Sequence, residues 1–282
     1  MKKICLLLGM LLAVNNAAMA ACEYECVAPY NLNNKFVTFM SAVTGVNSIN
    51  EKYVESVIKK EILKTISSED LEVDIDSYSP VDLGRGIFKS AHVKGNDIVV
   101  NDIHLTSLDL KTLCDFNYIK KSGSSVVFVE DMPMAFNITM TQDSINKTMK
   151  HGRYQKVISE LNKIGASYGG GLQISSTNVA IKSNKFYYIV GFNVPFLRHE
   201  QKMVLQADLN VKNGKIDFSN TKIVSGKIKL DLKKIDFILN YLNPLDFSVN
   251  IYADKEARVM VKTAEIQNNV IVTDGVVILQ KD

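Results

Sequence analysis

The chain has 282 residues, of which 46% are hydrophobic, and its 33 basic and 30 acidic side chains give a formal net charge of +3. This length and composition supply a sizeable hydrophobic core and exclude a disordered chain. The near-neutral charge argues against nucleic acid as a partner.

The N-terminus has the layout of a secretory signal. Lys2 and Lys3 precede an apolar run over residues 4–14, and small residues follow up to Ala20. The apolar run is too short to cross a bilayer as a helix. We therefore expect a signal peptide over residues 1–20, whose removal lowers the formal charge from +3 to +1 because Lys2 and Lys3 are lost with it.

The cysteines leave two processing alternatives. Cys5 is lost with the signal, so Cys22, Cys26 and Cys114 remain, an odd number for an exported protein. The sequence around Ala20 resembles a bacterial lipoprotein signal, in which residues 1–21 are removed and Cys22 is acylated. Cys26 and Cys114 then form a disulfide, which stabilises the fold by roughly 4 kcal/mol. Ordinary cleavage after Ala20 instead leaves Cys22 to pair with Cys26 or with Cys114.

Two helices are predicted after the leader. Apolar residues at helical spacing between Asn33 and Gly45 predict a short amphipathic helix. Ser48 and Glu51 then have the spacing of a capping box at the start of a longer helix that ends near Ile66. The lysines of this second helix are typical of a solvated face; a membrane-surface role is the weaker interpretation.

A series of strands begins near Leu71. Leu71, Val73 and Ile75 alternate with acidic residues, which predicts a half-buried strand with an acidic outer face. The sequence over residues 94–97 predicts a turn. The apolar alternation slips by one residue near Thr106, and this predicts a bulge or bend that would let the sheet curl.

The middle of the chain predicts one strand followed by helical segments. Met134, Phe136, Ile138 and Met140 share one face of the strand, and a helix begins at Thr141. Gly152 predicts a break in that helix. Apolar residues continue at helical spacing after the break, at Tyr154, Val157, Ile158, Leu161 and Ile164.

Residues 186–211 predict two long strands. The first has apolar side chains on both faces, so both faces need cover, either from protein or from protein on one side and an apolar ligand on the other. The second strand turns at Asn213-Gly214, a strong hairpin signal. Further strands over residues 228–232, 247–252, 258–266 and 270–279, with a short helix before Pro244, complete the chain.

The sequence contains no recognisable catalytic or metal-binding motif. His92, His104, His151 and His199 lie in different predicted elements without the spacing of a metal-binding helix. Cys114 could act as a nucleophile, but export favours a disulfide over a catalytic thiol. We therefore predict no enzyme activity, no catalytic residues, no metal and no cofactor.

Several diffuse motifs resemble the LmeA-like family of bacterial envelope proteins. The similarity extends from about Val54 to Leu279 and weakens in the last third, where Asn243-Pro244-Leu245 still fits. The motifs are Gly86-Ile87-Phe88-Lys89-Ser90, Asp102-Ile103-His104-Leu105, Ser107-Leu108-Asp109-Leu110-Lys111-Thr112 and Ile138-Thr139-Met140-Thr141-Gln142-Asp143-Ser144-Ile145-Asn146.

The resemblance implies an α+β fold in which a long curved antiparallel sheet wraps around helices, as in the tubular lipid-binding superfamily, and encloses an acyl-chain cavity. It implies an exported, non-catalytic protein that binds or transfers phospholipid or another acyl lipid in the periplasm or cell envelope. The protein would be tethered to a membrane if Cys22 is acylated. The expected organisation is a signal peptide over residues 1–20 (1–21 for a lipoprotein), an N-terminal segment over 21–48 and a single lipid-binding domain over 49–282.

The strand and helix patterns give a hypothesis for the cavity wall. Arg198 and Lys202, in the loop after the first long strand, are weaker candidates for contact with a phosphate headgroup, because a solvated loop explains them equally simply. The predicted lining residues are Phe186, Tyr188, Val190, Phe192, Val194 and Phe196, with Met134, Phe136, Ile138 and Met140, facing Val157, Ile158 and Leu161.

Two other functions fit the same sequence. In the first alternative the apolar residues fill a solid core, and exposed strand edges of an envelope protein bind a protein partner. A hydrolase that acts on lipids is the third interpretation.

Overall fold

A computed structural model of the chain describes residues 24–35, 46–100, 102–122, 125–167, 173–193, 197–225, 239–245 and 257–282. Within these ranges the fold is α+β, with open sheets whose strands pair antiparallel. Several predicted features lie outside the described residues. They are the signal peptide, Cys22, residues 36–45 of the first predicted helix, Val194, Phe196 and the strands over 228–232 and 247–252.

The described strands form three sheets. The seven-stranded sheet has the order β1 (Ile66–Ser67), β4 (Ser90–Val100), β5 (Ile103–Thr112), β8 (Met132–Met140), β14 (Val270–Leu279) and β13 (Ala257–Gln267), with β2 (Asp70–Asp76) also paired to β4. The four-stranded sheet has the order β12 (Lys215–Ser225), β11 (Gln201–Lys212), β10 (Lys185–Asn193) and β9 (Gln173–Lys182). The smallest sheet contains β3 (Ile87–Phe88), β6 (Asn117–Ser122) and β7 (Ser125–Phe128).

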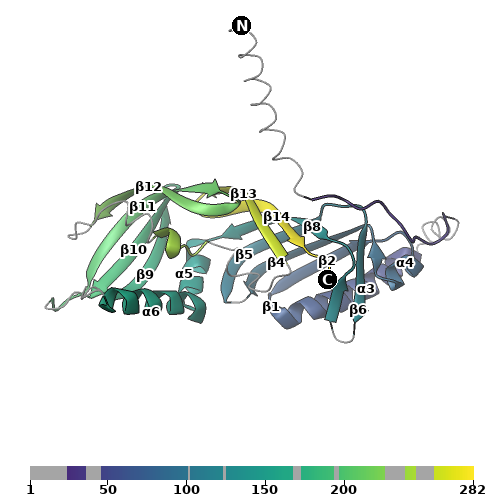
Figure 1. Cartoon of the computed structure of the whole chain (residues 1–282), viewed down its shortest axis with the longest axis horizontal. Helices are drawn as coiled ribbons and strands as arrows, with labels where there is room; N and C mark the ends of the chain where they lie inside the picture. Colours follow the sequence, from purple (N-terminus) through teal and green to yellow (C-terminus); the bar gives the residue numbers. More distant parts are fainter. Residues whose placement is uncertain are drawn as a thin grey trace, which may run out of the picture.

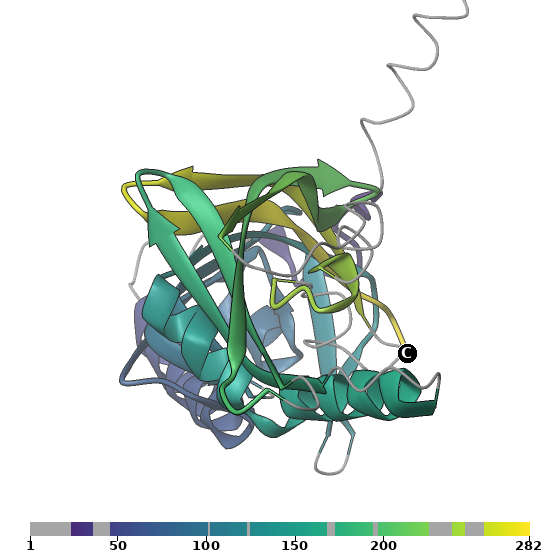
Figure 2. The same ribbon diagram turned by 90° about the vertical axis from the view of Figure 1, so that its left-hand side faces the viewer.

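The two larger sheets follow one another along the long axis of the molecule, as Figure 1 shows. Helix α3 (Val46–Thr65) packs on β2 of the seven-stranded sheet, and the short helix α4 (Pro80–Gly84) follows β2. Helix α5 (Gln142–Lys150) packs on both β5 and β9, and α6 (Gly152–Ser167) packs on β9. The view in Figure 2 shows α6 on the side opposite to β12.

One hydrophobic core runs through both larger sheets. The C-terminal hairpin joins them, because β13 belongs to the seven-stranded sheet and also contacts β11 and β12. At this junction the backbone N–H of Val261 donates to the carbonyl of Gly214 at 2.8 Å. None of the helices in the described ranges is long and apolar enough to cross a membrane.

Several local predictions are confirmed. Strand β2 alternates buried and exposed residues along its whole length. The helix after β8 begins at the predicted position, where the Thr141 hydroxyl accepts from Ser144 N–H, and it ends before Gly152, where α6 begins. The hairpin between β11 and β12 turns at Asn213 and Gly214, with φ angles of 52° and 72°. These positive angles are the ones that a tight two-residue hairpin requires.

The predicted capping box is wrong. Helix α3 begins at Val46, ahead of Ser48, so Ser48 does not stand at the helix start. The Glu51 carboxylate instead accepts from the backbone N–H and the hydroxyl of Ser77, at 2.9 and 2.6 Å. A tertiary hydrogen bond to the sheet has taken the place of the local one.

The region around residues 94–106 also differs from its prediction. Strand β4 continues through residues 94–97 without a turn, and β5 keeps a constant register with β4 across Thr106. The irregularity lies on the neighbouring strand at Asp97, which has a φ of 47°. Asp tolerates this left-handed conformation better than most residues, so the distortion is absorbed without a change of register.

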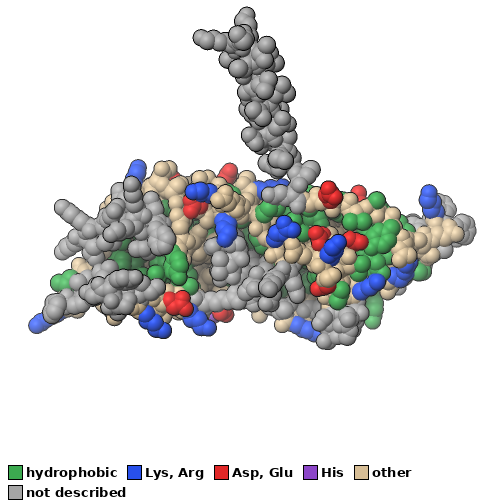
Figure 3. All heavy atoms as spheres, in the orientation of Figure 1, with side chains coloured by type: hydrophobic (Ala, Val, Ile, Leu, Met, Phe, Trp, Pro, Cys, Tyr) green, Lys and Arg blue, Asp and Glu red, His purple; other side chains and the backbone are tan. Residues whose placement is uncertain are grey.

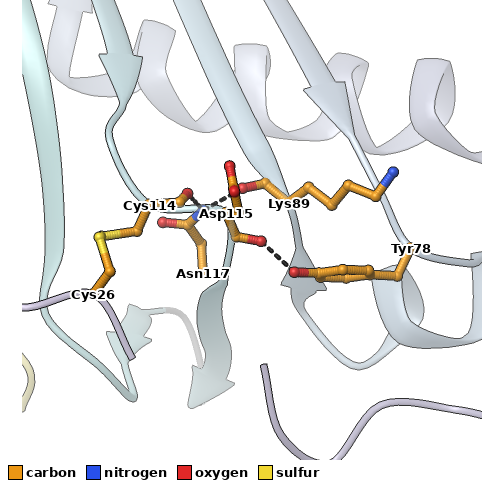
Figure 4. Close-up of a disulfide and its surroundings, with 6 residues drawn as sticks. All are labelled: Cys26, Tyr78, Lys89, Cys114, Asp115 and Asn117. Atoms are coloured by element: carbon orange, nitrogen blue, oxygen red, sulfur yellow. Dashed lines mark hydrogen bonds between the residues drawn. A yellow bond between two sulfur atoms is a disulfide. The ribbon is translucent and has the colours of Figure 1, made fainter. Parts of the chain in front are cut away.

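The N-terminal segment is fixed to the domain by a disulfide. Cys26 bonds to Cys114 across a sequence separation of 88 residues. The amide of Asn117 lies beside the bond and donates to the carbonyls of Lys89 and Cys114, at 2.7 and 3.0 Å (Figure 4). This pairing is the one expected with acylation of Cys22, and it differs from both pairings that involve Cys22.

Candidate functional site

The inner face of the four-stranded sheet is a continuous apolar surface. The strand register places Tyr188 between Val179 of β9 and Leu205 of β11. In the adjacent row of the sheet, Phe186 likewise lies between one residue of β9 and one of β11. We call this surface the apolar wall. It comprises the buried residues Val179, Ile181, Phe186, Tyr188, Val190, Phe192, Met203, Leu205, Ala207, Ile216 and Phe218.

The apolar wall is buried by the protein's own atoms. Phe186 and Tyr188 are 0% exposed and Phe192 is 6% exposed. The rings of Phe186 and Phe218 lie 4.8 Å apart and tilted by 30°, a favourable offset for two aromatic rings. The alternation that predicted this face of β10 is therefore confirmed for the residues from Phe186 to Phe192.

The opposite face of β10 is covered less completely. Tyr187 and Ile189 are half-buried, whereas Gly191 is buried beneath the Glu200 side chain. A Cβ atom at Gly191 would lie 2.2 Å from Glu200 Oε1. The carboxylate therefore occupies the space that any larger residue would need, and part of the cover on this face is polar.

Helix α6 supplies side chains that belong to the same core as the wall. Val157 and Leu161 are half-buried and Ile158 is buried, as the sequence predicted. The short segment around Pro244, which begins with a helical turn, contributes further buried residues that the sequence hypothesis did not include. These are Leu239, Leu242 and Leu245.

Two tyrosine hydroxyls meet within this apolar layer. The hydroxyl of Tyr154, from α6, hydrogen-bonds to the hydroxyl of Tyr188 and donates to the carbonyl of Leu242 at 2.9 Å. Since Tyr154 donates its proton to Leu242, Tyr188 donates to Tyr154. Burial raises the pKa of both phenols above the ordinary value, so both stay neutral at physiological pH. The hydrogen-bonded pair joins α6 to β10 and places no charged group in the apolar layer.

The outer edge of β9 is closed by side-chain amides from the helices. Asn146 of α5 donates to the carbonyl of Val179 at 2.9 Å and accepts from its N–H at 2.7 Å. Asn162 of α6 does the same for Ile174, with both distances at 2.8 Å. Each amide satisfies the two backbone groups that an edge strand would otherwise leave open.

The other edge of this sheet is closed in the same way. Asn240 accepts from the N–H of Phe218 at 2.8 Å and donates to its carbonyl at 3.3 Å. Asn243 donates to the carbonyl of Ile216 at 2.7 Å. These polar contacts hold the segment before Pro244 against β12, so that its leucines reach the core.

The predicted residues of β8 lie in the other sheet. Met134, Phe136, Ile138 and Met140 are all buried, but their strand pairs with β5 and β14. They share the continuous hydrophobic core with the apolar wall without belonging to the same sheet. The predicted lining set is thus divided between two sheets.

The predicted headgroup residues lie at an exposed end of the four-stranded sheet. Arg198 and Lys202 are exposed, and Lys202 Nζ lies 3.7 Å from Glu200 Oε2. Glu200 also accepts from the hydroxyls of Ser175 and Ser176, at 2.6 and 2.7 Å, and these hydrogen bonds are the main reason that its pKa is lowered. An ionised carboxylate therefore stands next to Lys202 and reduces the attraction of this loop for a phosphate.

Strand β9 was missed by the sequence prediction, although a signal for it exists. Val179 and Ile181 alternate with Asn178, Ala180 and Lys182 immediately before Ser183-Asn184. Both residues of that pair have positive φ angles, 51° and 54°, and form a two-residue hairpin with β10. No local pattern marks Asn146 and Asn162 as the partners of this strand.

The described part of the chain gathers no group of three or more His, Cys, Asp or Glu side chains that could hold a metal ion. The rings of His104 and His151 lie 4.8 Å apart, and His151 Nδ1 is 3.7 Å from an Asp102 carboxylate oxygen. Burial first, and then the neighbouring His151 and Lys147, lower the pKa of His104.

Comparisons of the chain with protein-family models, with curated proteins and with solved structures found no match.

Proposed function

We propose that this protein is exported and binds the acyl chains of a phospholipid, or of another acyl lipid, between the apolar wall and α6, without catalysis. The observation that supports this proposal is the wall itself, which is apolar from β9 to β12 and carries no ionised group. Acyl chains gain about 0.8 kcal/mol per buried CH₂ in a bilayer, so a lipid-binding site needs a comparably apolar surface.

The finer fold that we propose is a tubular lipid-binding arrangement, in which the two larger sheets curve around helices. The succession of the sheets along one axis and the continuity of their core are compatible with it. The resemblance of several motifs to LmeA-like envelope proteins supports the same proposal. In this arrangement the β8 residues extend the acyl-chain path from the apolar wall into the seven-stranded sheet.

A buried hydroxyl suggests where a polar atom of the lipid could bind. Thr221 of β12 is 7% exposed, and its hydroxyl has no hydrogen-bond partner among the described residues. A buried polar group without a partner is costly, and an ester carbonyl of the lipid would satisfy it. At the exposed end of the sheet, Arg198 is the better candidate for a headgroup phosphate, because Lys202 already faces Glu200.

The proposed location is the periplasm or cell envelope of a bacterium. The leader-like N-terminus supports export, and the Cys26–Cys114 disulfide is the kind of bond that persists in an oxidising compartment. We propose that Cys22 carries the membrane tether if the leader is of the lipoprotein type. Intact mass of the mature protein tests this, because acylation adds several hundred daltons at Cys22.

The near-complete burial of the wall favours a second candidate, an envelope protein whose apolar residues form a solid core. In that case its partner would be another protein. The closed edges of β9 and β12 weigh against recognition by strand addition at this sheet, since a partner strand would have to displace the asparagine amides.

Native mass spectrometry of protein purified from a bacterial host, before and after solvent extraction, tests lipid binding directly. A co-purified phospholipid mass, or uptake of a fluorescent fatty acid after extraction, supports the proposal. Absence of both would contradict it and favour the solid core. Release of hydrolysed lipid would instead indicate a hydrolase.

A pair of matched substitutions separates a ligand-lined wall from a solid core. Ala207→Phe enlarges a 2% exposed side chain in the apolar wall, whereas Ala264→Phe enlarges a 9% exposed one in β13. If lipid lies against Ala207, its substitution lowers the amount of retained lipid, whereas Ala264→Phe leaves that amount unchanged. In a solid core, Ala207→Phe instead lowers the free energy of unfolding by about 1–3 kcal/mol and leaves lipid content unchanged.

A further inference from the structure

Helix α3 divides its charged residues between two sides. Glu51 and Glu55 lie on the side that faces β2, together with the apolar residues Val54, Ile58 and Ile62, which pack against the core. The exposed side carries Lys52, Lys59, Lys60 and Lys64. Of the described charged side chains of α3, the acids therefore face the sheet and the lysines face the surroundings.

The two acids are held by the edge of the seven-stranded sheet. Glu55 accepts from the N–H of Ile75 at 3.0 Å, and Glu51 accepts from the N–H of Ser77 at 2.9 Å. These N–H groups belong to the end of β2 and the residue that follows it, and in the described part of the chain β4 is the strand partner of β2. Both carboxylates are therefore directed toward the sheet edge, where they keep their negative charge.

Large apolar side chains lie among these lysines. Tyr53 is 72% exposed, Val57 is 42% exposed and Leu63 is 41% exposed. None of the described side chains on this face is acidic. In Figure 3, basic and hydrophobic side chains adjoin one another at the lower right, a region where Figure 1 shows both β6 and α3. We call this surface the α3 basic face, made of Lys52, Tyr53, Val57, Lys59, Lys60 and Leu63.

We propose that the α3 basic face docks on the surface of an anionic lipid bilayer. The lysines complement the negative surface potential, and each contributes attraction only near the membrane. Tyr53 suits the headgroup region, because a phenol ring combines an apolar body with a polar tip. Val57 and Leu63 can enter the acyl boundary while the lysine stems reach outward to the headgroups.

The bilayer is favoured over an acidic protein because positive charge and exposed apolar side chains are interleaved on one helix side. A protein partner of that character would need a groove that is both acidic and apolar, whereas an anionic bilayer presents both properties over an unlimited surface. This inference goes beyond the proposed lipid-binding site, since the α3 basic face is the outer side of a helix and does not require a cavity.

Vesicle flotation with the purified mature chain tests the inference. The protein is expected to float with phosphatidylcholine vesicles that contain phosphatidylglycerol, to bind pure phosphatidylcholine vesicles much less, and to dissociate as salt is raised. Replacing Lys52, Lys59 and Lys60 by Gln should weaken binding to the anionic vesicles roughly 100-fold, at about fivefold for each lysine removed. Glutamine keeps the helix propensity, so circular dichroism and thermal unfolding should remain unchanged.

A matched control removes the same charge from the four-stranded sheet. Lys212, Lys215 and Lys222 are exposed there, and their joint replacement by Gln should leave vesicle binding unchanged. A second variant, with Tyr53, Val57 and Leu63 replaced by Gln, should bind more weakly while keeping the salt dependence. Together the two α3 variants separate the charged part of the contact from the apolar part.

Three results would overturn the inference. They are equal binding to neutral and anionic vesicles, equal loss in the control variant, and unchanged binding in the Lys52/Lys59/Lys60 variant. Loss of self-association in the α3 variants without any vesicle binding would identify a second copy of the chain as the occupant instead. Native mass spectrometry reports bound lipid independently of flotation, so failure of this inference is distinguishable from failure of the proposed function.

Discussion

The side chain of Asn146 makes both backbone hydrogen bonds of Val179, at 2.9 and 2.7 Å, and so takes the place of a neighbouring strand. Because Asn146 belongs to α5 and Val179 to β9, the contact joins a helix to the edge of the four-stranded sheet. It closes an edge that would otherwise be open for pairing with another chain.

Asn146→Ala should lower the free energy of unfolding by about 1–3 kcal/mol, because it leaves the N–H and carbonyl of Val179 without partners. Chemical denaturation measures this change. Asn178→Ala, at an exposed position of the same strand, is the control and should cost much less. Equal effects of the two substitutions would show that the amide contact does not contribute to stability.

Removing the hydroxyl of Tyr154, on the helix, should destabilise the protein more than removing the hydroxyl of Tyr188, on the sheet. Tyr154→Phe leaves the Leu242 carbonyl without its partner and removes one of the two side-chain partners of the Tyr188 hydroxyl, the other being Thr177, and should cost about 1–3 kcal/mol of unfolding free energy. Tyr188→Phe leaves the bond to Leu242 in place and should cost about 1 kcal/mol. Tyr187→Phe, on the opposite face of β10, is the control for both and should be near neutral.

The buried phenols should make the protein less stable at alkaline pH. Burial raises the folded-state pKa of Tyr188 above the ordinary value of 10.0. Below pH 10 the residue is protonated in both states and the effect is constant. As pH rises above 10 only the unfolded state releases the proton, so Tyr188 lowers stability by about 1.4 kcal/mol per pH unit until its folded pKa is reached.

Urea unfolding at a series of pH values from about 9 to about 11, on either side of the ordinary tyrosine pKa, measures the loss of stability at alkaline pH. Tyr188→Phe should have a shallower pH dependence than the wild type, whereas Tyr187→Phe should match the wild type. A Tyr188→Phe variant with an unchanged slope would contradict a raised pKa at this position.

His104 should make the protein less stable at acidic pH. Burial and the positive charges of His151 and Lys147 lower its pKa from 6.5, against a smaller opposing effect of Asp102 and Asp143. The unfolded state therefore binds more protons as pH falls through 6.5, and stability is lost in that range. His104→Gln should flatten the dependence measured by unfolding between pH 7 and pH 5, limits set roughly by the ordinary histidine pKa.

The exposed His199 provides the control for this measurement, and His199→Gln should leave the acidic pH profile unchanged. Titration of the His104 ring by nuclear magnetic resonance checks the cause directly. A ring that titrates above 6.5 in the folded protein would contradict the prediction.

Loss of the disulfide should destabilise the fold and release the N-terminal segment. Replacing Cys26 and Cys114 together by Ser should lower the free energy of unfolding by roughly 4 kcal/mol. Residues 24–35 should become sensitive to protease, although the Tyr30 hydroxyl still donates to Glu130 at 2.8 Å. Dithiothreitol should destabilise the wild type and not the double variant. Alkylation of Cys26 and Cys114 without prior reduction would contradict the pairing.

Local sequence patterns predicted the structure correctly where it depends on residues that are close together in the sequence. The alternation of residues 270–279 corresponds to β14, and the Thr141 cap and the Asn213-Gly214 turn lie where they were predicted. The burial of Phe186, Tyr188, Val190 and Phe192 on one face follows from the same two-residue period.

Patterns failed where a distant residue competed with a local contact. Glu51 has the spacing of a capping box, but Ser77 provides its hydrogen bonds, and the expected bulge at Thr106 is replaced by a left-handed Asp97 on the adjoining strand. Glu200 was overlooked because its partners Ser175 and Ser176 come from a strand that was itself missed.

The sequence alone thus determined the period and facing of most strands and helices, because side-chain alternation, caps and tight turns are properties of a few consecutive residues. Only the tertiary structure decided that Phe186 and Phe136 lie in different sheets, that Tyr154 meets Tyr188, and that asparagine amides close the sheet edges. These contacts join residues far apart in the chain, and their formation depends on the packing of whole elements around one core.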